Sequence, residues 1–122
     1  VWRVPHIAKE LFSPEELELG IHAGDIETSV MLSILPDVVR REKVVREFPH
    51  GLPSDSLLSM EGKLPFAWVT RDLSASGVLG DATAATEDKG TRLLESVVDS
   101  WVKAIADIYK FQQPQCFRSV SK

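Results

Sequence analysis

The sequence contains no asparagine and only one cysteine, Cys116, among its 122 residues. Without asparagine there is no acceptor site for N-linked glycosylation. A single cysteine cannot form an internal disulfide, which is typical of proteins from a reducing compartment. We therefore expect a cytoplasmic protein that is not held together by disulfides.

Long apolar runs and a large charge excess are also missing. The apolar runs are only a few residues long, whereas a membrane-spanning helix needs about 20 such residues, and no N-terminal signal pattern is present. The net charge is −4, with no long run of either sign. Neither nucleic acid nor a membrane is therefore expected as the main partner. Hydrophobic residues make up 43% of the chain, which is enough to bury one small core.

Two helices are predicted in the first third of the chain. Ser13 is a typical N-cap residue, Pro14 suits the first helical position and Glu16 completes a capping box, so a helix should begin here and stop at Gly20. A second helix is predicted to begin at about Asp25, as its N-cap, and to end just before the next proline. Its apolar residues recur at helical spacing.

The longest helix is predicted from about Thr86 to Lys110. Acidic residues follow its start, where the helix dipole favours them. Five large apolar residues form one continuous stripe along this helix. They are Leu94, Val98, Trp101, Ile105 and Ile108. We expect Trp101 to lie in the core.

Strand signals are weak by comparison. Residues 66–70 predict one short strand, and residues 40–48 leave room for a short helix. Residues 49–65 and 71–85 are expected to be loops, with a turn at residues 77–80. Amphipathic helices need a sheet to cover, and this chain supplies little of one. We therefore expect part of an α/β domain, from a fragment or a processed chain, since the sequence does not begin with Met.

The segment His22-Ala23-Gly24-Asp25-Ile26-Glu27-Thr28-Ser29 is the most informative for function. His22 precedes a helix and Glu27 lies in its first turn, where the helix dipole favours a neutral imidazole and an ionised carboxylate. Such a pair can transfer a proton or support a metal ligand. An ordinary helix start with a hydrogen-bonded turn histidine explains the same residues, and both interpretations stay open on these grounds.

Two motifs resemble the creatininase family of metal-dependent amidohydrolases. The first runs from His22 to Arg40 and is similar to the family's His-(Ala/Gly)-Gly-x-x-Glu-Thr-Ser motif, whose helix ends in Pro-Asp-Leu-Val. The second begins with Trp68-Val69-Thr70-Arg71, passes through Ser-Gly-Val-Leu-Gly-Asp at 76–81 and continues into Ala-Thr-Glu-Asp-Lys-Gly at 85–90. The matches occur in the expected order.

This resemblance implies the C-terminal part of a three-layer α/β/α domain and hydrolysis of a cyclic amide or related C–N bond at a two-metal site. His22 would transfer a proton to the leaving nitrogen, and Glu27 would orient His22 or the metal shell. The implied cofactor is a divalent metal (zinc, manganese or iron), and the implied partner is a small-molecule amide substrate. Trp68 is a candidate for lining the substrate pocket, although an aromatic residue in a strand usually belongs to the core.

The family's metal-binding motifs are missing from this sequence. The family holds its metals mainly through motifs that resemble Glu-x-His followed by Asp, and Asn-Gly-His-Gly-Gly-Asn, and neither occurs here. His6 and His50 match no ligand motif, so we expect the metal ligands to lie outside this chain. Residues 1–122 then correspond to the C-terminal half of a family domain, with 111–122 as a flexible tail.

Three functional hypotheses remain. The chain is part of a creatininase-like amidohydrolase and is inactive alone, or it is a truncated, non-catalytic relative that acts as a binding or assembly module through its helix stripes. A small ligand-binding domain without enzyme ancestry fits the ordered motifs less well. The missing sheet predicts a homo-oligomer or a complementing N-terminal half. The acidic residues Glu15, Glu16 and Glu18 are expected to form a solvated face.

Overall fold

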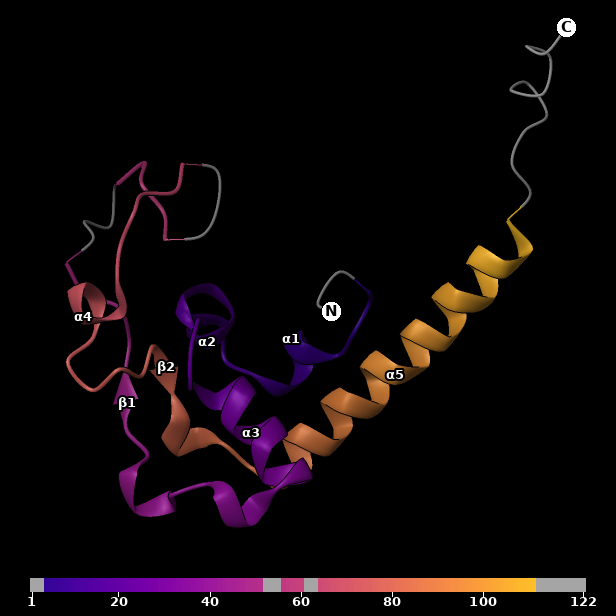
Figure 1. Ribbon diagram of the computed structural model, residues 1–122, viewed down its shortest axis with the longest axis horizontal. Coiled ribbons are helices and arrows are strands. Elements are labelled where there is room, and N and C mark those ends of the chain that lie inside the picture. Colours follow the sequence, from indigo (N-terminus) through magenta and orange to yellow (C-terminus); the bar gives the residue numbers. More distant parts are fainter. Residues whose placement is uncertain (1–3, 52–55, 61–63, 112–122) are drawn as a thin grey trace, which may run out of the picture.

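The computed structural model describes residues 4–51, 56–60 and 64–111 (Figure 1). Helices dominate, and the sheet within these residues has two strands of two residues each. In chain order the elements are α1 Ala8–Leu11, α2 Pro14–Leu19, α3 Asp25–Ile34, η1 Pro36–Val38, η2 Arg41–Lys43, β1 Arg46–Glu47, α4 Thr70–Leu73, β2 Gly80–Asp81, η3 Ala82–Ala84 and α5 Glu87–Lys110. The mixture of helix and a small sheet agrees with the α/β class. Of the predicted tail, 111–122, only Phe111 lies within the described residues.

The start of α2 and α5 follows from their capping residues. The Ser13 hydroxyl accepts the Glu16 N–H at 3.1 Å, and α2 ends at its C-cap Gly20, as predicted. The Thr86 hydroxyl accepts the Lys89 N–H at 3.3 Å at the start of α5. These caps satisfy backbone N–H groups that the first turn of a helix leaves without partners.

Helix α3 begins where the sequence predicted, but its N-cap residue is not the predicted Asp25. Gly24 is the N-cap and has no side chain to accept a hydrogen bond, whereas Asp25 is the first helical residue. Asp25 is buried and its carboxylate binds elsewhere, since Oδ2 lies 2.6 Å from Lys89 Nζ and Oδ1 accepts the Ser29 hydroxyl at 2.9 Å. A tertiary partner on α5 therefore replaces the local cap that the sequence suggested.

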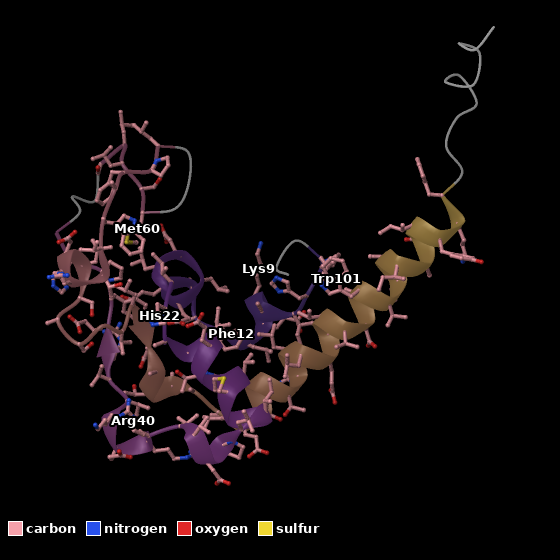
Figure 2. The ribbon with its side chains drawn as sticks, in the orientation of Figure 1. Lys9, Phe12, His22, Arg40, Met60 and Trp101 are labelled. Atoms are coloured by element: carbon pink, nitrogen blue, oxygen red, sulfur yellow. The ribbon has the colours of Figure 1, made fainter. Side chains whose placement is uncertain are left out.

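The first hydrophobic core lies where α1 and α3 meet the first half of α5. Phe12, labelled in Figure 2, packs there with Ala8, Leu93 and Val97, all of which are buried. Gly90 allows the two longer helices to approach closely, because a Cβ at this position would lie 2.5 Å from the carbonyl carbon of Ser29. The Thr86 N–H also donates to the Ser29 hydroxyl at 3.1 Å. This contact fixes α3 against the start of α5.

A second core lies beneath the loops that precede β2. It contains Met60, which Figure 2 labels, together with Leu73 and the fully buried Leu79. Trp68 packs against this cluster, and its indole N–H donates to the Met60 carbonyl at 3.2 Å. The turn predicted at residues 77–80 is therefore only partly correct, since Leu79 and Gly80 are in extended pairing and not in the turn.

The predicted strand at residues 66–70 was wrong. Residues 66–69 adopt no regular secondary structure, and Thr70 begins α4. A strand needs a hydrogen-bonding edge beside it, and the described part of the chain offers none there beyond one isolated bridge between Ser59 and Pro65. The short helix foreseen within 40–48 is also mostly wrong, because that segment contains only the 3-10 turn η2 followed by β1, which pairs antiparallel with β2.

The second half of α5 extends away from the other elements (Figure 1). The helix forms where it was predicted, but the other described residues leave most of its apolar stripe exposed. Val98, Ile105 and Ile108 are 57–70% exposed, and Trp101 is 39% exposed, so the prediction of a core position for Trp101 was wrong. The period of a sequence defines an apolar face, whereas burial also needs a partner surface. No helix within the described residues is long and apolar enough to cross a membrane.

Candidate active site

His22 lies between α2 and α3, in a loop that is tied to the segment leading into β2 (Figure 2). Its backbone forms a bridge with Leu79, in which the Leu79 N–H donates to the His22 carbonyl at 2.8 Å. The Ile21 N–H donates to the Leu79 carbonyl, also at 2.8 Å. These bonds fix the backbone of His22 while leaving its side chain 64% exposed. The imidazole is therefore anchored and accessible.

The next residue, Ala23, adopts a left-handed conformation with φ of 53°. This conformation is uncommon for a residue with a Cβ and is costly unless surrounding contacts hold it. Two contacts do so here. The Ala23 N–H donates to Glu27 Oε2 at 2.6 Å, and the Ala23 carbonyl accepts the Thr28 hydroxyl at 3.3 Å. The turn directs the chain from the His22 bridge into the first turn of α3.

The two residues proposed to act in catalysis lie next to each other. Glu27 is the third residue of α3, and its Oε2 lies 3.4 Å from His22 Nδ1. Because the same oxygen accepts the Ala23 N–H, the carboxylate is held in place by the loop that carries the histidine. A carboxylate beside one ring nitrogen favours a proton on that nitrogen and leaves the other for chemistry.

A hollow of about 300 Å³ lies beside this pair. Its wall is mainly apolar, and its polar side chains are His6, Glu16, His22 and Glu27. The position of His6 beside His22 was not predicted, because no sequence motif connects the two residues. The Nδ1 atom of His6 accepts the Ala8 N–H at 3.3 Å, so the start of α1 fixes its ring. Trp68 is not among the described residues that line the hollow, because it lies with the second core.

The sequence suggested that Glu16 belongs to a solvated acidic face, and this prediction was wrong. Glu16 is 2% exposed, and its carboxylate accepts the Ile26 N–H at 3.2 Å and the Asp81 N–H at 2.8 Å. It therefore does not complete the predicted capping box with Ser13. These partners lie 10 and 65 residues away in the sequence, which is why no local pattern revealed them.

A further carboxylate organises the loop before β2. Glu47 on β1 accepts the N–H groups of Ala75 and Ser76 at 2.7 and 2.9 Å, and also the Ser76 hydroxyl. These hydrogen bonds, first among them that of the Ser76 side chain, lower the pKa of Glu47 from 4.5 to about 2, because they stabilise the ionised form. Glu47 therefore fixes the loop that leads to Leu79 and the His22 bridge.

The described residues do not provide a metal site. They contain no group of three or more His, Cys, Asp or Glu side chains that could hold an ion. His22 and Glu27 offer two donors at one point, fewer than the roughly four ligands of a closed site. The donor set within residues 4–51, 56–60 and 64–111 therefore does not fit a two-metal centre.

The creatininase family model, described as creatinine amidohydrolase, matches residues 1–105. This chain belongs to the creatininase family. The match includes the loop of His22, the first turn of α3 and most of α5. It accounts for the ordered motifs in the sequence and for a fold that is part of a larger α/β domain.

The curated relatives of this creatininase-family chain are hydrolases with different named substrates. This chain is 39% identical over 85 residues to the mycofactocin precursor peptide peptidase of Mycobacterium ulcerans. The matched region covers 70% of this chain and 32% of that protein. The chain is 29% identical over 99 residues to the 3-dehydro-scyllo-inosose hydrolase of Thermotoga maritima, covering 72% and 32%. It is 30% identical over 105 residues to the creatinine amidohydrolase of Pseudomonas putida, covering 84% and 37%. The chain thus spans about a third of the length of these relatives.

Solved creatininases share the fold of this chain. A mutant creatininase complexed with creatine superposes with a TM-score of 0.58 at 29% identity, covering 84% of this chain and 36% of that chain. Other matching structures are described as a zinc–zinc type and a manganese form of creatininase. These matches confirm the fold class as part of the α/β creatininase domain.

Proposed function

We propose that this chain is the part of a metal-dependent amidohydrolase that carries its proton-transfer pair, and that the reaction is hydrolysis of a cyclic amide or a related C–N bond. The observation that carries this proposal is the placement of His22 and Glu27, whose Nδ1 and Oε2 atoms lie 3.4 Å apart beside an open hollow. Family membership supports the hydrolase class. The single cysteine supports a cytoplasmic location.

The proposed chemistry uses the two ring nitrogens of His22 differently. A proton on Nδ1 faces the Glu27 carboxylate, which leaves Nε2 to exchange a proton with the reactants. Nε2 takes a proton from the attacking water and then delivers it to the leaving nitrogen, which must be protonated when the C–N bond breaks. Glu27 orients the ring and stabilises the imidazolium that forms between these steps. The exposure of the imidazole lets a substrate in the hollow reach it.

The residues that would bind the metal are proposed to lie outside this chain. The solved relatives described as zinc and manganese forms support a divalent metal, of which zinc, manganese and iron are the candidates. Because the described residues do not fit a metal centre, we propose that its ligands come from a complementing N-terminal half. Trp68 is proposed to contact substrate once that half is in place, since its ring is only partly buried in the second core.

A second candidate function is a non-catalytic relative that acts as a binding or assembly module. The uncovered apolar face of α5 favours it, because such a face is typical of an interaction surface. In this case the chain would form a homo-oligomer, or bind a partner, without turnover. The creatine complex of a relative supports a small-molecule amide as the ligand of the first candidate, and it has no bearing on this second one.

One experiment tests both candidates. The chain is mixed with the N-terminal two-thirds of the Pseudomonas putida creatinine amidohydrolase, in zinc or manganese, and hydrolysis of creatinine and of short peptides is measured. We expect activity in the mixture, and a loss of about 100-fold or more with His22→Gln, since proton transfer by a positioned side chain contributes about 10²–10⁴-fold. His50→Gln is the matched control, because this exposed histidine lies in the loop after β1. Full activity of His22→Gln would refute the proton-transfer role, and association without turnover would favour the assembly module.

A further inference from the structure

The His22–Glu27 pair is divided between two structural elements. His22 is attached to the segment leading into β2 through its backbone bridge with Leu79, whereas Glu27 belongs to α3. The distance between the two side chains therefore depends on how α3 sits relative to β2. A residue that binds both elements would control this distance.

Glu16 binds both elements with one carboxylate. Its Oε1 accepts the N–H of Ile26, the residue before Glu27, and its Oε2 accepts the N–H of Asp81, two residues after Leu79. Because the N-cap Gly24 has no side chain, Glu16 also supplies the acceptor that the first turn of α3 would otherwise lack. One oxygen thus holds the element of Glu27, and the other holds the element to which His22 is attached.

Three glycines enclose this carboxylate. A Cβ on Gly20 would lie 2.7 Å from Glu16 Cδ, and one on Gly24 would lie 3.0 Å from the same atom. A Cβ on Gly80 would lie 2.7 Å from both Glu16 Oε2 and Gly24 Cα. The backbones of α3 and β2 therefore meet directly around the carboxylate, with no room for a side chain at any of the three positions.

The burial of Glu16 makes these two hydrogen bonds necessary. A carboxylate removed from water is costly unless it is paired or hydrogen-bonded. The two Glu16 oxygens accept backbone N–H groups of α3 and β2, and the positive end of the α3 dipole lies beside the carboxylate. If α3 or β2 moves away, the buried carboxylate loses one of these two hydrogen bonds. The cost of that loss holds the two elements together.

We infer that Glu16 is a positioning residue, which holds α3 and β2 in register so that Glu27 faces His22. Its two hydrogen bonds come from backbone N–H groups, so it acts through the backbones that carry these side chains. The inference rests on the proposed role of the pair. The test measures the geometry of the pair and not turnover. The inference can therefore fail while the proposed function stands, and the proposed function can fail while the inference stands.

The test compares Glu16→Gln with Glu27→Gln by NMR of the His22 ring nitrogens in the full chain. Glutamine retains the size of Glu16 but places an NH2 group against one of the two backbone donors. We expect the His22 ring signals of Glu16→Gln to move to the positions that they have in Glu27→Gln, and the amide signal of Ile26 or Asp81 to shift. Glu18→Gln is the matched control, because Glu18 is an exposed carboxylate on the same helix, and its His22 signals should stay at the wild-type positions. A folded Glu16→Gln chain with wild-type His22 signals would overturn the inference.

Hydrogen exchange of the wild-type chain gives a second test that does not depend on a variant that folds. If one carboxylate holds both elements, the amides of Ile26 and Asp81 should open together with that of Ala23, which donates to Glu27. Their protection factors should then agree within about threefold, as expected of one cooperative unit. Unrelated exchange rates for Ile26 and Asp81 would show that Glu16 does not couple the two elements.

Discussion

Replacement of Gly90 by alanine tests the close approach of α3 and α5 most directly. A Cβ at this position would lie 2.5 Å from the Ser29 carbonyl carbon and 3.0 Å from the Val30 nitrogen, both in the backbone of α3. Ordinary contacts of this kind are about 3.4–4 Å long, and the Ser29 carbonyl oxygen would lie closer still, so α5 must retreat from α3 by more than about 1 Å. Backbone atoms cannot rotate away as a flexible side chain can, and the strain therefore passes to the helix pair.

The expected loss of stability combines three effects. Overpacking of this kind costs about 1–3 kcal/mol. Retreat of α5 also weakens the hydrogen bond from the Thr86 N–H to the Ser29 hydroxyl, which is worth about 1 kcal/mol. Against these, alanine is better than glycine inside a helix by about 0.5–1 kcal/mol. We expect Gly90→Ala to lower the free energy of unfolding by about 2 kcal/mol, with a larger loss if the buried pair of Asp25 and Lys89 separates.

Urea denaturation followed by circular dichroism measures this difference. Thr91→Ala is the matched control, because Thr91 is exposed on the same turn of α5. This control should leave stability unchanged or raise it by a few tenths of a kcal/mol, because alanine is the better helix former. A Gly90→Ala chain as stable as wild type, or more stable, would refute the argument that α3 and α5 are in backbone contact.

Three further predictions concern assembly, pH and metal. The isolated chain should self-associate, because exposed apolar side chains on α5 each gain about 1.5–3 kcal/mol when fully buried. Trp101→Asp should shift the sedimentation profile towards monomer, and Lys103→Asp, on the polar face, should not. A wild-type chain that sediments as a monomer would contradict this prediction. Since the pKa of Glu47 falls from 4.5 to about 2 on folding, its stabilising effect is complete above pH 4.5 and is lost as the pH falls towards 2. The difference in urea midpoint between wild type and Glu47→Gln should therefore shrink over this range, and a constant difference would show that the bonds to Ala75 and Ser76 do not form. Elemental analysis should find little or no zinc or manganese in the purified chain, and a tight stoichiometric ion would reveal a ligand set that these residues do not suggest.

Helices α2, α3 and α5 could be predicted from the sequence because their signals are local. Ser13 and Thr86 cap helices through hydrogen bonds to residues three positions away. Gly20 ends α2, and the apolar period sets the length of α5. The placement of His22 beside Glu27 was equally predictable, since five residues across a helix start determine which side chains can meet. For the helix caps the relevant distances are set by the geometry of a single turn, whereas for the pair the sequence predicts only that the two side chains lie close together.

The errors arose where a residue depends on a distant partner. Residues 66–70 have strand-like composition, but no neighbouring edge pairs with them within the described chain. Trp101 has the spacing of a core residue, yet it is 39% exposed, because the described residues do not enclose it. Asp25 has the side chain of an N-cap, yet its carboxylate binds Lys89 on α5. Composition and period describe what a segment can do, and the partner decides what it does.

The sequence by itself determined the approximate boundaries of α2, α3 and α5, the family motifs and the adjacency of His22 and Glu27. Only the tertiary structure decided that Glu16 is buried and that three glycines enclose it, because its partners lie 10 and 65 residues away. Local hydrogen bonds follow from neighbouring residue types, whereas the position of a buried charge follows from which backbones converge on it. For this reason the sequence revealed the proton-transfer pair, while the structure showed what holds it in place.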